Sequence, residues 1–187
     1  MSKLAFYTFG ILHEPREHPR AKGFSDRSPF VYASAENSKG FVDRAPQRIT
    51  EKQDPRWGDG LTEPRFVLNE KDALAPATLS LWEDLESVYA FAYNGRHAEA
   101  LSKREEWFRK PEWPTYVAWW VDDDHIPARE EAAAKLEQLH DQGATPDAFD
   151  FKTPFDANGN PWRMDRDNIR VRAEVVKKFD QDNPTGL

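Results

Sequence analysis

The stretch TYVAWWV, residues 115–121, is an almost unbroken run of apolar side chains. Its length suits a β-strand, and Pro114 and Asp122 bracket it. Successive side chains of a strand point to opposite faces of the sheet, so we expect Trp119 and Trp120 to face opposite sides. Both faces of the sheet that contains this strand are therefore predicted to be buried.

Further elements follow from the hydrophobic pattern on either side of this strand. Asp84 is a typical N-cap and Gly143 a typical C-cap for neighbouring helices. Three prolines, two glycines and many charges make residues 48–76 a long excursion with a short extended piece at 66–68. Strands are predicted at 4–12, from 41 and at 77–82, and helices at 24–38, 85–92, 97–108, from Pro127 to Gly143 and at 169–179.

The order of these elements is the βαββαβ pattern of the ferredoxin-like α+β fold, with a four-stranded antiparallel sheet. Residues 1–155 are predicted to form this domain, with the excursion at 48–76 inside it. Residues 156–187 form a C-terminal extension with a helix and a tail. Because helices on one face leave the other sheet face uncovered, we expect a second copy of the sheet to cover it, giving a homodimer.

Composition excludes several classes of function. The net charge of −7 disfavours a nucleic-acid partner, and 39% hydrophobic residues suffice for a packed core. The absence of cysteine excludes disulfides, zinc–thiolate sites, iron–sulfur clusters and a thiol nucleophile. The first residues, MSKLAFYTFGIL, lack the features of a signal peptide, and no segment reaches the roughly 20 apolar residues of a membrane helix. We expect a soluble, cytoplasmic protein without membrane contact.

The charged stretch HEPREHPR, residues 13–20, lacks the H-E-x-x-H spacing of a zinc hydrolase. His13 and His18 are five residues apart, which separates them by roughly 140° on a helix. Asp122, Asp123 and Asp124 before His125 are typical of a solvated turn. Glycine-rich phosphate loops and the G-x-S-x-G elbow are absent. We therefore predict no metal site and no cofactor-binding residues.

Three segments resemble a known family: SLWEDLESVYAFAYNGRHAEALSKREEWF (80–108), YVAWWVDDDHIP (116–127) and GATPDAFDFKTPF (143–155). The family is described only as a domain of unknown function. It is similar to the dimeric α+β barrel superfamily, which includes antibiotic-biosynthesis monooxygenases, haem-degrading monooxygenases, muconolactone isomerase and EthD-like proteins. The resemblance covers residues 77–155 well and 4–42 loosely. The excursion and the tail depart from it and would reshape the pocket or the dimer contact.

The resemblance implies a pocket between the sheet and the helices of each protomer. On one continuous helix, His97 and Arg104 share a stripe. We expect His97 to act as general acid or base and Arg104 to hold a carboxylate, phenolate or enolate. The structural alternative is that His97 caps the break at Gly95 while Arg104 pairs with a nearby glutamate. The predicted substrate-binding wall, for which plain core packing is the alternative, consists of Tyr7, Trp82, Trp107, Phe108 and Trp119.

The leading functional hypothesis is a cofactor-independent enzyme that acts on an aromatic or polyketide-like metabolite of secondary metabolism. The reaction would be monooxygenation, or a proton-shuttling isomerisation, cyclisation or dehydration. A non-catalytic dimeric protein that binds a small ligand is the main alternative. A haem protein with His97 as axial ligand is a third reading, which the scarcity of basic residues placed to hold propionates disfavours.

Overall fold

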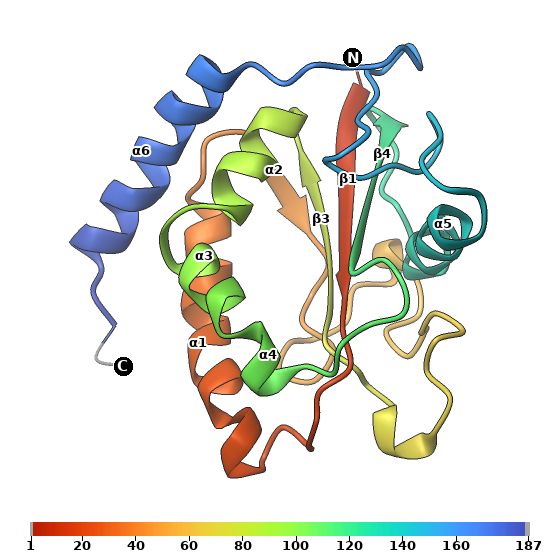
Figure 1. The fold of residues 1–187 in the computed structure, drawn as a ribbon, viewed down its shortest axis with the longest axis vertical. Helices are drawn as coiled ribbons and strands as arrows, with labels where there is room; N and C mark the ends of the chain where they lie inside the picture. Colours follow the sequence, from red (N-terminus) through yellow and green to blue (C-terminus); the bar gives the residue numbers. More distant parts are fainter. Residues whose placement is uncertain (1, 186–187) are drawn as a thin grey trace. The chain divides into compact units, whose positions relative to one another are not determined.

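The computed structural model describes residues 2–185 and shows an α+β fold with one four-stranded sheet, in the order β2-β3-β1-β4 (Figure 1). Strands β1 and β4 pair antiparallel, with Leu4 opposite Trp120 and Ala5 opposite Trp119. The predicted strands are all present, and the bounds of β3 agree with the prediction. The strands are β1 (Ser2–Phe9), β2 (Phe41–Arg44), β3 (Ala77–Trp82) and β4 (Tyr116–Asp122).

Two predicted caps are confirmed at the ends of helices. The carboxylate of Asp84 accepts a hydrogen bond of 2.8 Å from the Ser87 amide at the start of α2, and Gly143 ends α5 with a φ of 73°. The helices are α1 (Pro19–Glu36), α2 (Leu85–Ala92), α3 (Gly95–Ser102), α4 (Arg104–Trp107), α5 (Arg129–Gln142) and α6 (Arg166–Asp182), with 3-10 turns η1 (Pro55–Trp57) and η2 (Glu70–Asp72).

Several predicted segments differ from the structure. Strand β1 covers residues 2–9 rather than the predicted 4–12. The helix predicted at 97–108 is broken at Lys103 into α3 and α4. Helix α1 begins at Pro19 rather than at residue 24, because proline suits the first turn and the His18 side chain accepts a hydrogen bond from the Arg20 amide. Residues 66–68 form no strand. Helix α6 is longer than predicted because Asp165 caps it.

The chain forms two compact units from interleaved segments. The first combines the segment that ends at Ile11 with Asp43–Leu81 and Pro111–Arg163, and so contains β1, β4, α5 and nearly all of β3. The second combines Leu12–Val42, Trp82–Lys110 and the segment that begins at Met164, and so contains the other five helices.

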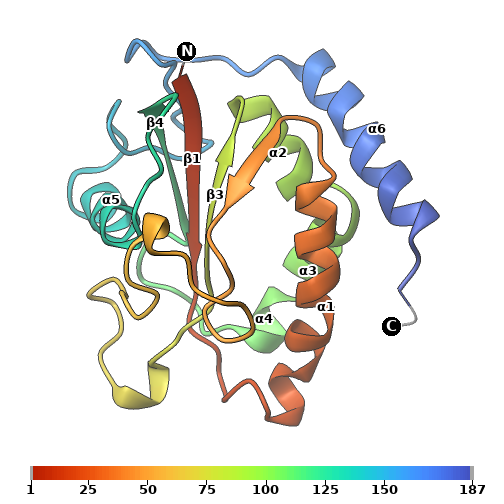
Figure 2. The ribbon, with the colours of Figure 1, turned by 180° about the vertical axis from the view of Figure 1, so that it is seen from behind.

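The core of the first unit lies between the sheet and α5, which runs along one face of β1 and β4 (Figures 1 and 2). Ala5, Tyr7 and Trp119 on this face are buried with Ala132 and Leu136 of α5. The apolar stripe predicted for this helix, which begins at Arg129 rather than at Pro127, thus faces the sheet.

The opposite face of β1 and β4 is buried too. Leu4 and Ala118 are inaccessible to solvent, and Phe151 stacks on Phe6 at 5.5 Å between ring centroids. The backbone of Phe149 pairs with Ala118 at the edge of β4. The prediction that both faces are buried is therefore correct. The cover includes α5 and residues 149–151 of the same chain. Within residues 2–185, β1 and β4 therefore show no uncovered face from which to infer a homodimer, and the dimer stays a prediction.

Helix α6 is packed against the other helices of the second unit. The Arg172 guanidinium donates a 2.7 Å hydrogen bond to Asp84 of the α2 cap. Near the other end of α6, the Asp180 carboxylate accepts from the Ser34 hydroxyl at 2.6 Å and from the Arg96 amide at 2.8 Å. These contacts fix the C-terminal extension to α1, α2 and α3. Within residues 2–185, every helix is too short or too polar to cross a lipid bilayer.

Candidate functional site

His97 lies in the first turn of α3, where its ring is engaged by the preceding helix. Its Nδ1 donates a 2.7 Å hydrogen bond to the carbonyl of Ala92, the last residue of α2. Burial lowers the pKa of His97, and the bond to Ala92 opposes this effect. A neutral ring that closes a helix end corresponds to the structural alternative, because it satisfies a carbonyl that the helix leaves without a partner.

Arg104 begins α4 and is exposed. Its guanidinium donates to the Leu101 carbonyl at 3.3 Å and lies 3.9 Å from the Glu105 carboxylate. Because the helix breaks at Lys103, His97 and Arg104 do not share the predicted stripe. The predicted arrangement, in which His97 and Arg104 lie on one face of a continuous helix, is therefore wrong.

The five predicted wall residues fall into three groups. The Trp82 ring stacks on the Phe91 ring with 5.4 Å between their centroids, and the His97 ring centroid lies 4.8 Å from that of Phe91. Trp107 and Phe108 belong to a separate small cluster around Phe24 in the same unit. Tyr7 and Trp119 are in the core of the first unit. The Trp119 indole donates a 2.7 Å hydrogen bond to Glu131, whose other oxygen lies 2.7 Å from His125 Nε2.

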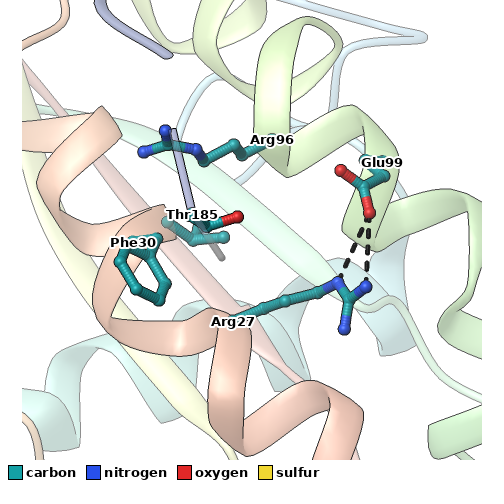
Figure 3. Close-up of a pocket in the computed structure, with 6 residues that line it drawn as sticks. Arg27, Phe30, Arg96, Glu99 and Thr185 are labelled. Atoms are coloured by element: carbon teal, nitrogen blue, oxygen red, sulfur yellow. Dashed lines mark hydrogen bonds and ion pairs between the residues drawn. The ribbon is translucent and has the colours of Figure 1, made fainter. Parts of the chain in front are cut away.

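A small pocket of the second unit lies between α1 and α3 (Figure 3). Arg27 and Phe30 of α1 face Arg96 and Glu99 of α3, and Arg27 reaches the Glu99 carboxylate at 3.4 Å. Its volume of about 30 Å³ has room for water but not for a metabolite. Among residues 2–185, no three histidine, aspartate or glutamate side chains gather closely enough to bind a metal ion.

A larger open pocket lies in the excursion, in the first unit. Its volume of about 490 Å³ falls within the range of roughly 300–1,000 Å³ typical of small-molecule sites. We call it the excursion pocket. It is lined by Arg48, Gln53, Pro55, Gly58, Asp59, Gly60 and Leu61.

Side-chain contacts hold the wall of the excursion pocket in place. Trp57 is buried in the core of the first unit and anchors the loop. The Gln53 amide donates to the carbonyls of Gln47 at 2.9 Å and Glu51 at 3.0 Å. Gly58 has a φ of 78° and sits so close to the Glu130 carboxylate that a Cβ would collide with it. The pocket is therefore bounded by ordered chain rather than by a loose loop.

Arg48 lines the excursion pocket, and its charged side chain is buried. Its side chain is only 4% exposed, and it donates to Glu63 at 3.0 Å, to the Ala75 carbonyl at 3.1 Å and to the Thr62 carbonyl. The Nε atom is buried and has no hydrogen-bond partner within the described residues. A buried donor without an acceptor costs about 1–3 kcal/mol, so this nitrogen needs an explanation.

Tyr7, in the second half of β1, is buried in the core of the same unit. Burial raises its pKa to about 12, while the positive charges of Arg48 and Arg129 oppose the rise. The phenol is thus protonated at neutral pH. Sequence reasoning found Tyr7 but missed Arg48, because no local pattern links the two.

Comparison with known proteins gives a family and no activity. No curated protein and no solved structure matches the chain. The family described as "Domain of unknown function (DUF3291)" matches residues 3–165, which include the sheet and the whole excursion pocket, while α6 begins beyond the matched region. Because the match spans most of the sequence, this chain belongs to the family Domain of unknown function (DUF3291).

Proposed function

We propose that this protein binds a small molecule in the excursion pocket and catalyses proton transfer on it without a cofactor. The observation that carries the proposal is the position of Arg48, which lines the pocket and acts electrostatically on the buried Tyr7. Concave sites with an apolar wall and a few polar groups of altered pKa are typical of enzymes that act on small molecules.

The chemistry would depend on the positive charge of the Arg48 guanidinium. The Arg48 charge would stabilise an enolate or phenolate of the substrate as it forms, with the proton passing to solvent water. Isomerisation, cyclisation and dehydration of an aromatic or polyketide-like metabolite all pass through such an anion. Monooxygenation, the other predicted reaction, would draw on the same stabilisation.

This proposal assigns the polar role to Arg48 instead of His97 and Arg104. The Arg104 guanidinium lies in solvent beside Glu105, and the His97 ring is held by Ala92. A test of ligand entry should therefore target the excursion pocket.

Leu61 provides that test, with Leu68 as its matched control. Both leucines belong to the excursion and are strongly exposed, at 71% and 81%, but only Leu61 lines the pocket. Compounds that bind the wild type, found by saturation-transfer NMR in a library of aromatic and polyketide-like molecules, should lose affinity about tenfold in Leu61→Ser, since contact with a leucine is worth about 1.5 kcal/mol. Leu68→Ser should bind like the wild type. Equal affinities for all three proteins would exclude the excursion pocket.

The second candidate function is ligand binding without catalysis. It is favoured by the Tyr7 pKa of about 12, which lies far from the neutral range where a general acid works best. Mass spectrometry of each bound compound after long incubation separates the two functions. A product that forms with the wild type and more slowly with Leu61→Ser supports the enzyme. Compounds that bind through Leu61 and stay unchanged support the binding protein.

We also propose the ferredoxin-like architecture and the homodimer as finer structural assignments. The strand order β2-β3-β1-β4 and the alternation of strands and helices support the first. Light scattering during gel filtration tests the second: a mass near 43 kDa, about twice the 21.6 kDa of one chain, would be the dimer.

A further inference from the structure

We infer that the ligand of the excursion pocket carries a positively charged amine, which donates hydrogen bonds to the Asp59 carboxylate and to the side-chain oxygen of Gln53. The inference rests on the proposed function of this pocket and specifies the chemical class of its ligand.

The first argument is which charged groups of the pocket lining a ligand can reach. The Arg48 side chain is buried, and both of its terminal nitrogens already donate to acceptors of the chain. Asp59 is exposed, and it is the only carboxylate of the lining within the described residues. A ligand that enters the pocket therefore contacts a negative charge, which favours a positively charged group in the ligand.

The second argument is that the accessible side-chain groups accept hydrogen bonds. One Asp59 oxygen accepts from the Leu61 amide at 2.9 Å, and the other has no partner among residues 2–185. The Gln53 amide nitrogen donates to backbone carbonyls of the excursion at 2.9 Å and 3.0 Å, which leaves its oxygen for a ligand. That oxygen lies against Gly60, the neighbour of Asp59, where a Cβ would approach it to 2.6 Å. An ammonium group has three N–H donors and no acceptor, so it matches these two acceptors.

The third argument is the charge around the pocket wall. The Glu130 carboxylate accepts from the Asp59 amide at 2.9 Å and lies so close to Gly58 that a Cβ there would collide with it. The Arg48 charge, by comparison, is offset by Glu63 at 3.0 Å. The potential on the Asp59 side of the pocket is therefore negative. An amine bound there leaves the carbonyl end of the substrate free to form the proposed enolate.

The apolar part of the lining, Pro55 and Leu61, determines the shape of the probe. Benzylamine and benzyl alcohol share a ring and a methylene, and only the amine is charged at neutral pH. In ¹⁵N-labelled wild-type protein, the amide signals of Gly60 and Leu61 should shift with saturation on addition of benzylamine. Benzyl alcohol should bind about fivefold more weakly, which is the effect of one partly exposed ion pair, and about 0.5 M NaCl should reduce this difference.

Two variants test the contact with Asp59. Asp59→Ser keeps a side-chain acceptor for the Leu61 amide but removes the charge, so it should bind benzylamine about fivefold more weakly and benzyl alcohol unchanged. Glu70→Gln is the matched control, because it removes a carboxylate from the same excursion at an exposed residue outside the pocket lining. It should bind both probes like the wild type.

The outcomes separate this inference from the proposed function. Equal binding of benzylamine and benzyl alcohol to the wild type would overturn the amine assignment and leave the pocket standing. An equal loss of benzylamine affinity in Asp59→Ser and Glu70→Gln would also overturn it, because the attraction would then come from the net charge of the protein. A loss of both probes in Asp59→Ser would do the same, since Asp59 would then only shape the turn. Absence of any Leu61-dependent ligand would refute the proposed function itself.

Discussion

Arg172 provides the sharpest test of how α6 is held. Its side chain is 9% exposed and binds Asp84 at 2.7 Å, Asn168 at 3.0 Å and the Ser87 hydroxyl. Replacing it by methionine keeps most of the apolar stem but leaves the Asp84 carboxylate without its cation. Removing one member of a buried ion pair typically costs about 3–5 kcal/mol. Because Asp84 is 30% exposed and water can reach it, we expect the lower end, about 3 kcal/mol.

Arg170, on the same helix, is the matched control. It is 75% exposed and pairs with Asp167 at 3.1 Å, so Arg170→Met should cost about 0.5 kcal/mol or less. A third variant, Arg172→Met with Asp84→Asn, keeps a capping side chain and removes the uncompensated charge. It should recover part of the lost stability.

Urea unfolding followed by far-UV circular dichroism measures these differences directly. In thermal unfolding, a loss of about 3 kcal/mol corresponds to a decrease in Tm of about 6–12 °C for a chain of this size. If Arg172→Met and Arg170→Met are equally stable within about 0.5 kcal/mol, the ion pair with Asp84 does not hold α6, and the reasoning fails.

Two further predictions follow from titrating side chains. For Tyr7, both folded and unfolded chains are protonated below pH 10.0. Above this pH the unfolded chain loses the proton first, so stability falls with rising pH, by on the order of 3 kcal/mol up to the folded pKa of about 12. Urea unfolding between about pH 9 and pH 11 should show a smaller decline for Tyr7→Phe than for the wild type, and parallel curves would contradict the burial of the phenol. Burial lowers the pKa of His97. Its neutral ring therefore contributes fully to stability above pH 6.5. This contribution is lost as the pH falls towards the folded pKa, because the unfolded chain takes up the proton first. His97→Gln should therefore depend less on pH than the wild type between about pH 7 and pH 5, and an unchanged slope would show that His97 is accessible to protonation in the folded state.

Local sequence patterns determined the elements whose causes are local. The Asp84 cap, the Gly143 C-cap and the bounds of β3 depend on residues that are neighbours in the chain, and each was predicted correctly. The continuous helix through 97–108 was wrong because the apolar stripe gave no sign of the break at Lys103. The apolar run around Trp119 showed that both sheet faces are buried, but not that α5 would cover one of them.

The candidate site was decided only by the tertiary structure. Tyr7, Arg48, Glu63 and Arg129 come from a strand, an irregular excursion and a helix that are far apart in the sequence. Periodicity reports which side of an element is buried, because it reflects the 2.0 and 3.6 residue repeats of strands and helices. Periodicity contains no information on which charged residue, distant in the sequence, interacts with the buried phenol of Tyr7. These groups interact only after the excursion has folded onto the sheet, because long-range packing brings together residues that are far apart in the sequence.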